Sequence, residues 1–440
     1  MPAQLIGKRV SRAAFEAAKL EKFRALVAFL TADSPYYAEI VRTRSIDTQT
    51  CSPQDFPVLT KALLKEHFDR IVTVPDVSRR AVEEFLTHSK DPRDLLLDKY
   101  LVIHTSGSSG EVGYFVYSEE DWVRATARQH RGNARAAPMS RWRVAYYAAV
   151  DGHYAGVSTF MNPWRRAEPN VEIRLFDVND PLSTVLEDLN RFQPDFLCGY
   201  TTALRILAER QAAGDLHIKP VILRTGGEAL TERDRALLFG AFGCDVGGWY
   251  GSSEHLLMGT TKYDSTDIVL YDDDLLYEFF DDHTLVTNLF NRTLPLIRYR
   301  MADVIRPAYE DRSSEPYLTI RSLVGRSEVL PTFVNRSGEE DYISAITIAE
   351  LFVAGIARFQ MHLLSKTRFL LKVLLDRQLS RAQGDDAIEA MRRRLGGILR
   401  QKSLDNVEFD VQAVDDLPID PVTRKFKLVV DGARESLREQ

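Results

Sequence analysis

The chain has 440 residues, of which 45% are hydrophobic and 27% are charged, and its formal net charge is −6. This composition is ordinary for a globular protein of two or three domains, and it gives no basic footprint for nucleic acid. Its apolar runs are too short to cross a membrane, its start lacks a signal-peptide pattern, and its three cysteines are too scattered for a disulfide framework or a zinc motif, so we expect a cytoplasmic protein with no nucleic-acid or membrane partner.

A short apolar run at 100–103 predicts a strand, and a loop rich in glycine and hydroxyl residues follows it at 104–113. Glycines let several backbone N–H groups converge on one anion, and hydroxyls add donors that carry no charge. The loop therefore has the composition of a phosphate-binding site. It is not a Walker loop, because no Gly-Lys-Ser/Thr sequence follows. A flexible turn has the same composition and remains an alternative.

The middle of the chain alternates strand and helix signals. Residues 143–150 and 171–176 predict strands. Residues 180–191 predict a helix, with Asp180 as its cap and an apolar stripe along one face. The block 196–212 predicts a strand, a turn and another helix. This alternation favours parallel α/β layers.

Several later segments combine glycines with polar or charged residues and follow apolar runs. They are Gly226-Gly227-Glu228, Tyr250-Gly251-Ser252-Ser253-Glu254, Arg300-Met301-Ala302-Asp303, Gly325-Arg326 and Thr423-Arg424-Lys425-Phe426-Lys427. The second segment is not a hydrolase elbow, because glutamate rather than glycine follows the last serine.

The last part of the chain has its own alternation of elements. Residues 359–363, 368–375 and 406–411 predict strands, and 385–400 predicts a helix with one apolar face. This order favours a small α+β domain of ordinary size.

The ordered set of segments, from about residue 50 to 430, resembles the adenylate-forming superfamily of acyl-CoA synthetases, peptide-synthetase adenylation domains and luciferases. It is most similar to the phenylacetate–CoA ligase branch, because the chain is short and Val112-Gly113 stands where most members have Pro-Lys. The resemblance implies an α/β fold with a large N-terminal adenylate-forming domain of layered sheets and helices. A small mobile α+β C-terminal domain would follow, giving domains 1–325 and 326–440 with a hinge just after Gly325-Arg326.

The resemblance also implies the reaction. A carboxylic acid, aryl or arylalkyl in that branch, would attack ATP to form an acyl adenylate, and coenzyme A would then displace AMP. Such a site needs no nucleophile of its own; it must neutralise phosphate charge and align two anions. An amine or a carrier protein as acceptor, and a nucleotide-binding module that has lost catalysis, are the alternatives.

Residue roles follow from the same resemblance. The β- and γ-phosphates would be held by Thr105, Ser106, Gly107, Ser108, Ser109 and Gly110. The adenine would lie along Gly226, Gly227 and Glu228 and stack on Tyr250. Gly251 and Ser252 would complete the nucleotide site, Ser253 would contact phosphate, and Glu254 would bind Mg²⁺, for which one carboxylate is enough.

Asp303 would accept hydrogen bonds from both ribose hydroxyls, and Arg326 would reach ribose or phosphate. His153 would gate the acid pocket near the α-phosphate. Lys425 would bridge the attacking carboxylate and the α-phosphate during adenylation. Lys427 is the rival for this role, because Arg424 stands where the family has glycine. Each residue also has a purely structural interpretation, as a helix-start glutamate, a core tyrosine or an exposed loop charge.

Overall fold

The computed structural model describes residues 11–105, 112–127, 141–165, 168–281, 283–301, 303, 305, 307, 317–321, 330–344, 347–348, 351, 353–376, 378–418 and 427–431. Its helices are α1 (Arg12–Asp33), α2 (Pro35–Thr43), the 3₁₀ helix η2 (Pro53–Asp55), α3 (Lys61–Glu66), α4 (Phe68–Ile71), α5 (Arg79–His88), α6 (Glu119–Thr126), α8 (Ala155–Met161), α9 (Leu182–Phe192), α10 (Thr201–Ala213), α11 (Glu232–Phe242) and α13 (Arg381–Gln401).

An eight-stranded sheet forms the centre of the large domain, with the strand order β13-β9-β8-β7-β6-β5-β3-β4. Its strands are β3 (Trp142–Ala148), β4 (Val171–Asp177), β5 (Phe196–Tyr200), β6 (Ile222–Gly226), β7 (Asp245–Ser252), β8 (Leu256–Thr261), β9 (Ile268–Leu270) and β13 (Thr319–Ile320). The neighbours from β4 to β7 pair in parallel, as the alternating strand and helix signals predict, and β8, β9 and β13 extend the sheet antiparallel.

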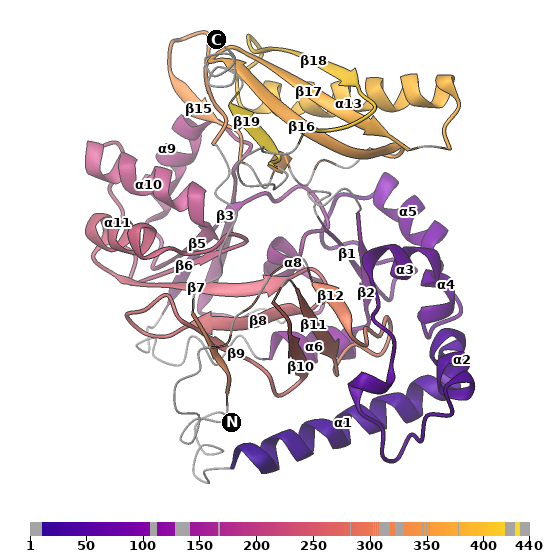
Figure 1. Ribbon diagram of the computed structural model, residues 1–440. Coiled ribbons are helices and arrows are strands. Elements are labelled where there is room, and N and C mark those ends of the chain that lie inside the picture. Colours follow the sequence, from indigo (N-terminus) through magenta and orange to yellow (C-terminus); the bar gives the residue numbers. More distant parts are fainter. Residues whose placement is uncertain are drawn as a thin grey trace.

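Smaller antiparallel units stand beside this sheet. They are the hairpin of β1 (Leu101–His104) with β2 (Tyr114–Tyr117), and the three-stranded sheet of β10 (Leu275–Phe279), β11 (Thr284–Asn288) and β12 (Tyr299–Met301). Helices α9, α10 and α11 cover one face of the parallel strands (Figure 1) and share a core with them. The N-terminal helices, the β1–β2 hairpin and the β10–β12 sheet share a second core. The large domain is therefore built around two packed cores.

Helix α9 starts differently from the prediction. The helix begins at Leu182 with Pro181 at the N-cap, so Asp180 is not the cap. The Leu182 amide instead donates to Asp341 Oδ2, 3.0 Å away. A carboxylate far along the chain thus replaces the local cap, which no local pattern could indicate.

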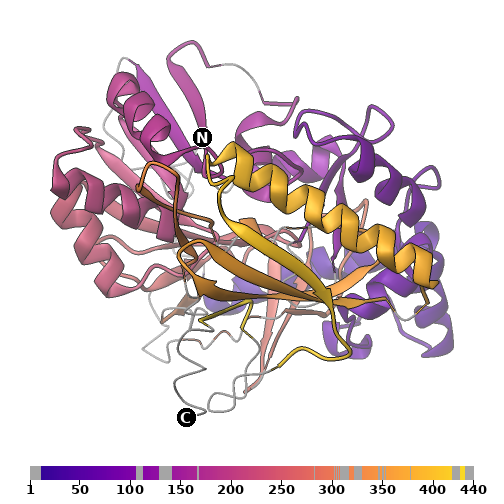
Figure 2. The same ribbon diagram turned by 90° about the horizontal axis from the view of Figure 1, so that it is seen from above.

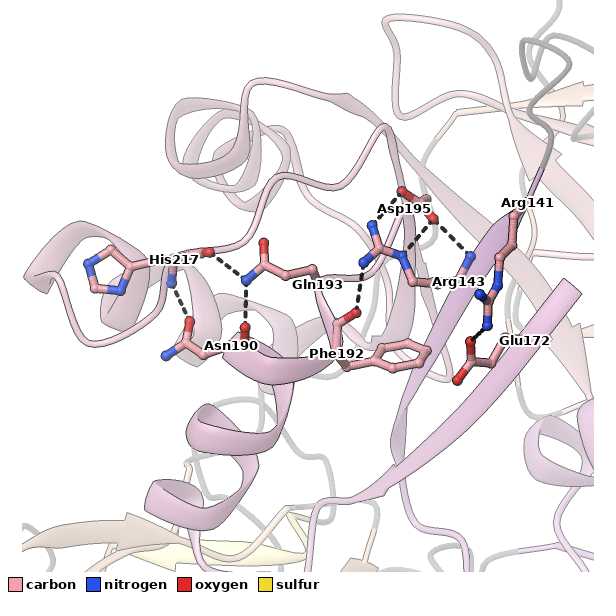
Figure 3. Close-up of polar contacts among 8 residues, drawn as sticks. All are labelled: Arg141, Arg143, Glu172, Asn190, Phe192, Gln193, Asp195 and His217. Carbon is pink, nitrogen blue, oxygen red and sulfur yellow. Dashed lines mark hydrogen bonds and ion pairs between the residues drawn. The ribbon is translucent and has the colours of Figure 1, made fainter.

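The amino ends of the parallel strands are tied together by polar contacts (Figure 3). The Arg143 guanidinium at the start of β3 donates to both carboxylate oxygens of Asp195, each at 3.2 Å, just before β5. Gln193 ends α9 with positive φ and donates to the carbonyls of Asn190 and His217. These contacts join β3, the end of α9 and the segments before β5 and β6 at the amino edge of the sheet.

The small C-terminal domain contains a four-stranded sheet in the order β18-β17-β16-β19. Its strands are β16 (Ile356–Ser365), β17 (Arg368–Leu375), β18 (Glu408–Ala413) and β19 (Val429–Asp431), and the hairpin of β14 (Thr332–Val334) with β15 (Glu340–Tyr342) precedes it. Helix α13 begins at a capping box of Ser380 and Gln383 and buries its apolar face against the sheet. Figure 2 shows α13 alongside these strands.

The α/β class with a small α+β C-terminal domain is therefore confirmed. The proposed hinge at Gly325-Arg326 lies outside the described residues, and the boundary between domains 1–325 and 326–440 stays a prediction.

Candidate functional site

The carboxyl edge of the parallel strands brings most of the predicted site segments together. Strand β3 ends five residues before His153, β6 ends at Gly226, and β7 ends at Ser252. The chain runs outward from β3 to β4 on one side and from β5 to β7 on the other, so the strand order reverses between β3 and β5. Ligands of open α/β sheets bind at the carboxyl edge beside such a reversal.

The glycine and hydroxyl loop is the tip of the β1–β2 hairpin, and the structure describes its base. The Thr105 amide donates to Gly113 O at 2.9 Å, and the Gly113 amide donates to Thr105 Oγ1 at 2.8 Å. This reciprocal pair closes the loop at its neck. The expected phosphate-binding residues Ser106, Gly107, Ser108, Ser109 and Gly110 lie outside the described residues.

The end of β7 lies against this neck. Ser253 Oγ donates to His104 O at 3.4 Å, and Tyr117 OH donates to Ser253 O at 2.6 Å. The expected phosphate-contacting serine therefore contacts His104, the first residue of the 104–113 segment. Ser252 Oγ accepts from the His255 amide and shapes the turn between β7 and β8.

Gly251 has a structural reason for being glycine. It lies at a register shift in the β7–β8 pairing, and a Cβ there would be 2.6 Å from Leu256 O. A side chain cannot fit at this bulge. The position thus allows the turn that presents Ser253 and Glu254.

Tyr250 and Asp303 meet although 53 residues separate them. Tyr250 OH donates to Asp303 Oδ2 at 3.1 Å. The Tyr250 ring is only 4% exposed, and burial raises the pKa of its phenol well above 10. Asp303 is exposed, so its carboxylate faces the solvent side of this pair. The expected ribose acceptor is held in place by the expected adenine neighbour, whose ring is packed in the core.

Glu254 is partly exposed at the same edge, and Tyr299 OH donates to its Oε1 at 3.4 Å. A carboxylate with two oxygens keeps acceptor capacity beyond this one contact. No cluster of three or more His, Cys, Asp or Glu side chains that could hold a metal occurs in the described ranges. The donor set suits a cation that takes one carboxylate and completes its shell with substrate oxygens and water.

Glu228 uses its carboxylate within the fold. Both of its carboxylate oxygens accept from Thr202 Oγ1 at 2.8 Å, and Oε2 also accepts from the Thr202 amide at 2.7 Å. Thr202 is in the first turn of α10, so the carboxylate meets the positive end of that helix. Burial raises the pKa of Glu228, and these donors oppose the shift. Gly227 beside it has φ +75°, which only glycine adopts easily.

His153 is 1% exposed and lies against the Phe85 ring, with ring centroids 4.9 Å apart. Its Nε2 is 3.0 Å from Ser89 Oγ, which donates to Asp94 at 2.6 Å. The imidazole therefore donates from Nε2, and its buried Nδ1 has no hydrogen-bond partner among the described residues. Burial lowers the pKa of His153, so a neutral ring presents a lone pair at the end of β3.

The remaining predicted residues, Arg326 and Lys425, lie outside the described residues. Both flanks of the 419–426 segment that carries Lys425 are described. The buried Gln360 amide donates to Pro418 O at 3.0 Å and to Lys427 O at 2.7 Å. One side chain of β16 thus joins the two ends of this segment.

Lys61 is a residue that the sequence reasoning missed. It begins α3, and its ammonium donates to Thr105 Oγ1 at 3.3 Å, at the neck of the glycine and hydroxyl loop. The loop itself lacks the lysine that follows it in most members of the superfamily that the sequence resembles. The missing loop lysine was the one sequence signal that a cation must come from elsewhere. Nothing in the α3 segment indicates that Lys61 contacts Thr105, which is 44 residues away.

We compared the chain with known protein families, sequences and structures. No family model matches the chain. Protein CapK from Staphylococcus aureus is 20% identical over 336 residues, which are 70% of this chain and 67% of CapK. No described helix is long and apolar enough to cross a membrane.

Solved structures of 2-hydroxyisobutyryl-CoA ligase are similar over nearly the whole chain. The postadenylation state with 2-HIB-AMP has a TM-score of 0.57 at 17% identity and covers 97% of this chain and 93% of that one. The open conformation with 2-HIB-AMP and CoA has a TM-score of 0.55 at 18% identity and covers 95% and 91%. The chain therefore has the fold of 2-hydroxyisobutyryl-CoA ligase, which is an α/β fold of the kind that the sequence resemblance implies. The phenylacetate–CoA ligase-like branch stays a prediction.

Proposed function

We propose that this protein is an AMP-forming acid–thiol ligase. A carboxylate oxygen attacks the α-phosphorus of ATP, the bond to the bridging oxygen breaks, and pyrophosphate leaves. The thiol sulfur of coenzyme A then attacks the acyl carbonyl, AMP leaves with the bonding electrons, and the thiol proton is released. The observation that carries the proposal is the meeting of three separate motif segments at one edge, through the Ser253–His104 and Tyr250–Asp303 contacts.

The nucleotide roles follow from this arrangement. Asp303 would accept from the ribose hydroxyls while Tyr250 OH keeps its carboxylate in place. Thr105 and Ser253 would bring hydroxyls to the phosphates. Glu254 would hold Mg²⁺, which would neutralise charge on the triphosphate.

Lys61 would add a cation to the same phosphates. Its position at the neck of the loop supports the proposal that it replaces the missing loop lysine from outside the loop. An ammonium binds phosphate as a compact point charge and needs no fixed fork geometry, so it can act from a neighbouring helix.

The small domain would adopt different orientations for the two half-reactions, with Lys425 near the reacting atoms only during adenylation. Solved forms of 2-hydroxyisobutyryl-CoA ligase include postadenylation and thioesterification states. Distinct domain orientations would let one site serve two reactions without holding both sets of groups at once.

The acid would be a small-molecule carboxylic acid, and the resemblance makes aryl and arylalkyl acids the first class to test. His153 would contact this acid at the end of β3. Because burial lowers the pKa of His153, its ring would be neutral beside the carboxylate of the acid. It would neither repel that carboxylate as an anion does nor attract it as a cation does.

The experiment is pyrophosphate release with Mg²⁺ and ATP across a panel of acids, with and without coenzyme A. We expect release that depends on the acid, and an acyl-CoA product when the thiol is present. ADP and orthophosphate as products would exclude adenylation. Release without any acyl-CoA would point to an amine or carrier-protein acceptor, and nucleotide binding without release would indicate a module that has lost catalysis.

A further inference from the structure

Lys402 is a buried lysine at the end of α13, with 1% of its surface exposed. Its ammonium donates to Val178 O at 2.7 Å and to Asp180 O at 3.0 Å, and it lies 3.1 Å from Asp341 Oδ1. An ammonium has three protons, so each can be used in one of these contacts. Val178 and Asp180 belong to the large domain, directly after β4, whereas α13 belongs to the small domain.

The contacts around Lys402 join the same two parts. Gln401 Nε2 donates to Asp177 Oδ2 at 3.2 Å and to Asp180 Oδ1 at 3.1 Å. The hydroxyls of Tyr342 and Tyr147 are 2.8 Å apart, and the Lys402 ammonium lies over the Tyr342 ring, 4.9 Å from its centroid. Figure 1 shows the small domain, with α13, β16, β17 and β18, above the part of the large domain that contains β3.

These contacts lie at the functional edge of the molecule. Asp177 pairs with Ala148 at the carboxyl ends of β4 and β3, and His153 follows β3. The small domain is therefore docked beside the proposed acid site, through a charged side chain whose main partners are backbone carbonyls. A lysine that served only the small domain's own core would have its partners in that domain.

A buried charge is better suited to setting an orientation than to adding stability. Desolvation cancels part of the attraction, but the hydrogen bonds to two carbonyls leave a net gain, and any displacement that separates the ammonium from its oxygens is strongly disfavoured. Burial lowers the pKa of Lys402, and the neighbouring carboxylates oppose this shift. When the domains separate fully, water hydrates the Lys402 ammonium again. Full separation therefore costs less free energy than a small displacement that breaks the contacts while the ammonium stays buried.

We propose that Lys402 is a positioning residue that locks the small domain in the orientation described here, by binding the carbonyls of Val178 and Asp180. The lock would select one of the two half-reactions, and this part rests on the proposed function. Release of Lys402 would accompany the change of orientation between them.

The first test measures opening of the interface by hydrogen exchange and needs no activity. The probe is the Leu182 amide, which donates to Asp341 across the interface. Lys402→Met alone leaves Asp341 buried without its cation and can impair folding. The decisive comparison is therefore Lys402→Met/Asp341→Asn against Asp341→Asn, because both keep an oxygen acceptor for Leu182 and only the first lacks the ammonium.

We expect protection of Leu182 to fall about tenfold or more when the ammonium is removed, since charge-assisted hydrogen bonds to two carbonyls are lost. Peptides from the buried strand β5 should keep their protection. Arg400→Met, which removes an exposed cation one residue before Gln401, should change neither. Equal protection of Leu182 in the two compared variants would overturn the proposal.

The second test measures the two half-reactions separately in the same variants. We expect the ratio of the pyrophosphate-forming rate to the thiol-transfer rate to change about tenfold or more. If exchange at Leu182 is faster but the ratio of the two rates is unchanged, the positioning role of Lys402 is supported. Its link to the two-step reaction is then refuted. Unchanged exchange would refute the lock whatever the ratio does.

Discussion

Asp177 gives a prediction whose size follows from the structure. Its side chain is 6% exposed at the end of β4, where it accepts from the Asn179 amide and from Gln401 of the small domain. Burial raises its pKa from 3.8 to about 6, with Asp180 and Asp151 adding to the shift and the two donors opposing it. At about 1.4 kcal/mol per pKa unit, the difference is worth about 3 kcal/mol.

The sign follows from proton binding. Between the unfolded and folded pKa values of Asp177, the folded protein keeps a proton that the unfolded chain has released. Stability from this group is therefore fully present below the unfolded value and is lost as the pH rises through about 6. From about pH 4.5 to about pH 7.5, linkage gives a loss of about 2 kcal/mol.

The assay is chemical unfolding of the wild type and Asp177→Asn across this pH range. Asparagine keeps the acceptor for Asn179 and does not titrate, so other groups cancel in the difference between the two proteins. We expect the free energy of unfolding of the wild type to fall by about 2 kcal/mol relative to the variant as the pH rises. A constant difference, or one that grows in favour of the wild type, would refute the reasoning that Asp177 is buried at this interface.

The remaining predictions concern the nucleotide and the moving domain. Lys61→Met should raise the KM for ATP by about 10- to 100-fold through loss of one charge-assisted contact, whereas Lys65→Met on the same helix should not; equal effects would mean that α3 is merely destabilised. Asp303→Ala should weaken ATP and AMP binding alike by about 2–3 kcal/mol in calorimetry, because both carry the ribose, and unchanged affinities would show that this aspartate is not the ribose acceptor. Lys425→Ala should reduce acid-dependent pyrophosphate release about 10²–10³-fold and spare acyl transfer from a pre-made adenylate. If only Lys427→Ala produces that loss, Lys427 rather than Lys425 has the adenylation role.

The sequence by itself determined the chemistry available to the protein. Glycines with hydroxyls, an aromatic residue before Gly-Ser-Ser-Glu and an aspartate after an arginine are local patterns, and their order along the chain predicted the fold that the structure confirms. The strands at 171–176 and 368–375 were also predicted correctly, because the hydrophobic pattern of a strand is a local property of the chain.

Only the tertiary structure decided which polar groups have spare capacity. The Glu228 carboxylate accepts hydrogen bonds from Thr202 in the first turn of α10, which is 26 residues earlier in the chain. Asp180 looked like a helix cap, but Asp341 caps the helix and the Asp180 carbonyl binds Lys402. A hydrogen bond depends on distance in space, and a single sequence gives no measure of that distance between remote segments.

The same reason explains the two lysines that the sequence did not single out. Lys61 and Lys402 stand in ordinary helical surroundings, where a lysine is usually a solvated charge. Packing of the β1–β2 hairpin against α3 brings Lys61 to the loop neck, and docking of α13 on the end of β4 buries Lys402. Local pattern fixed which charges the chain carries, and long-range packing decided which of them lose their water and acquire a partner.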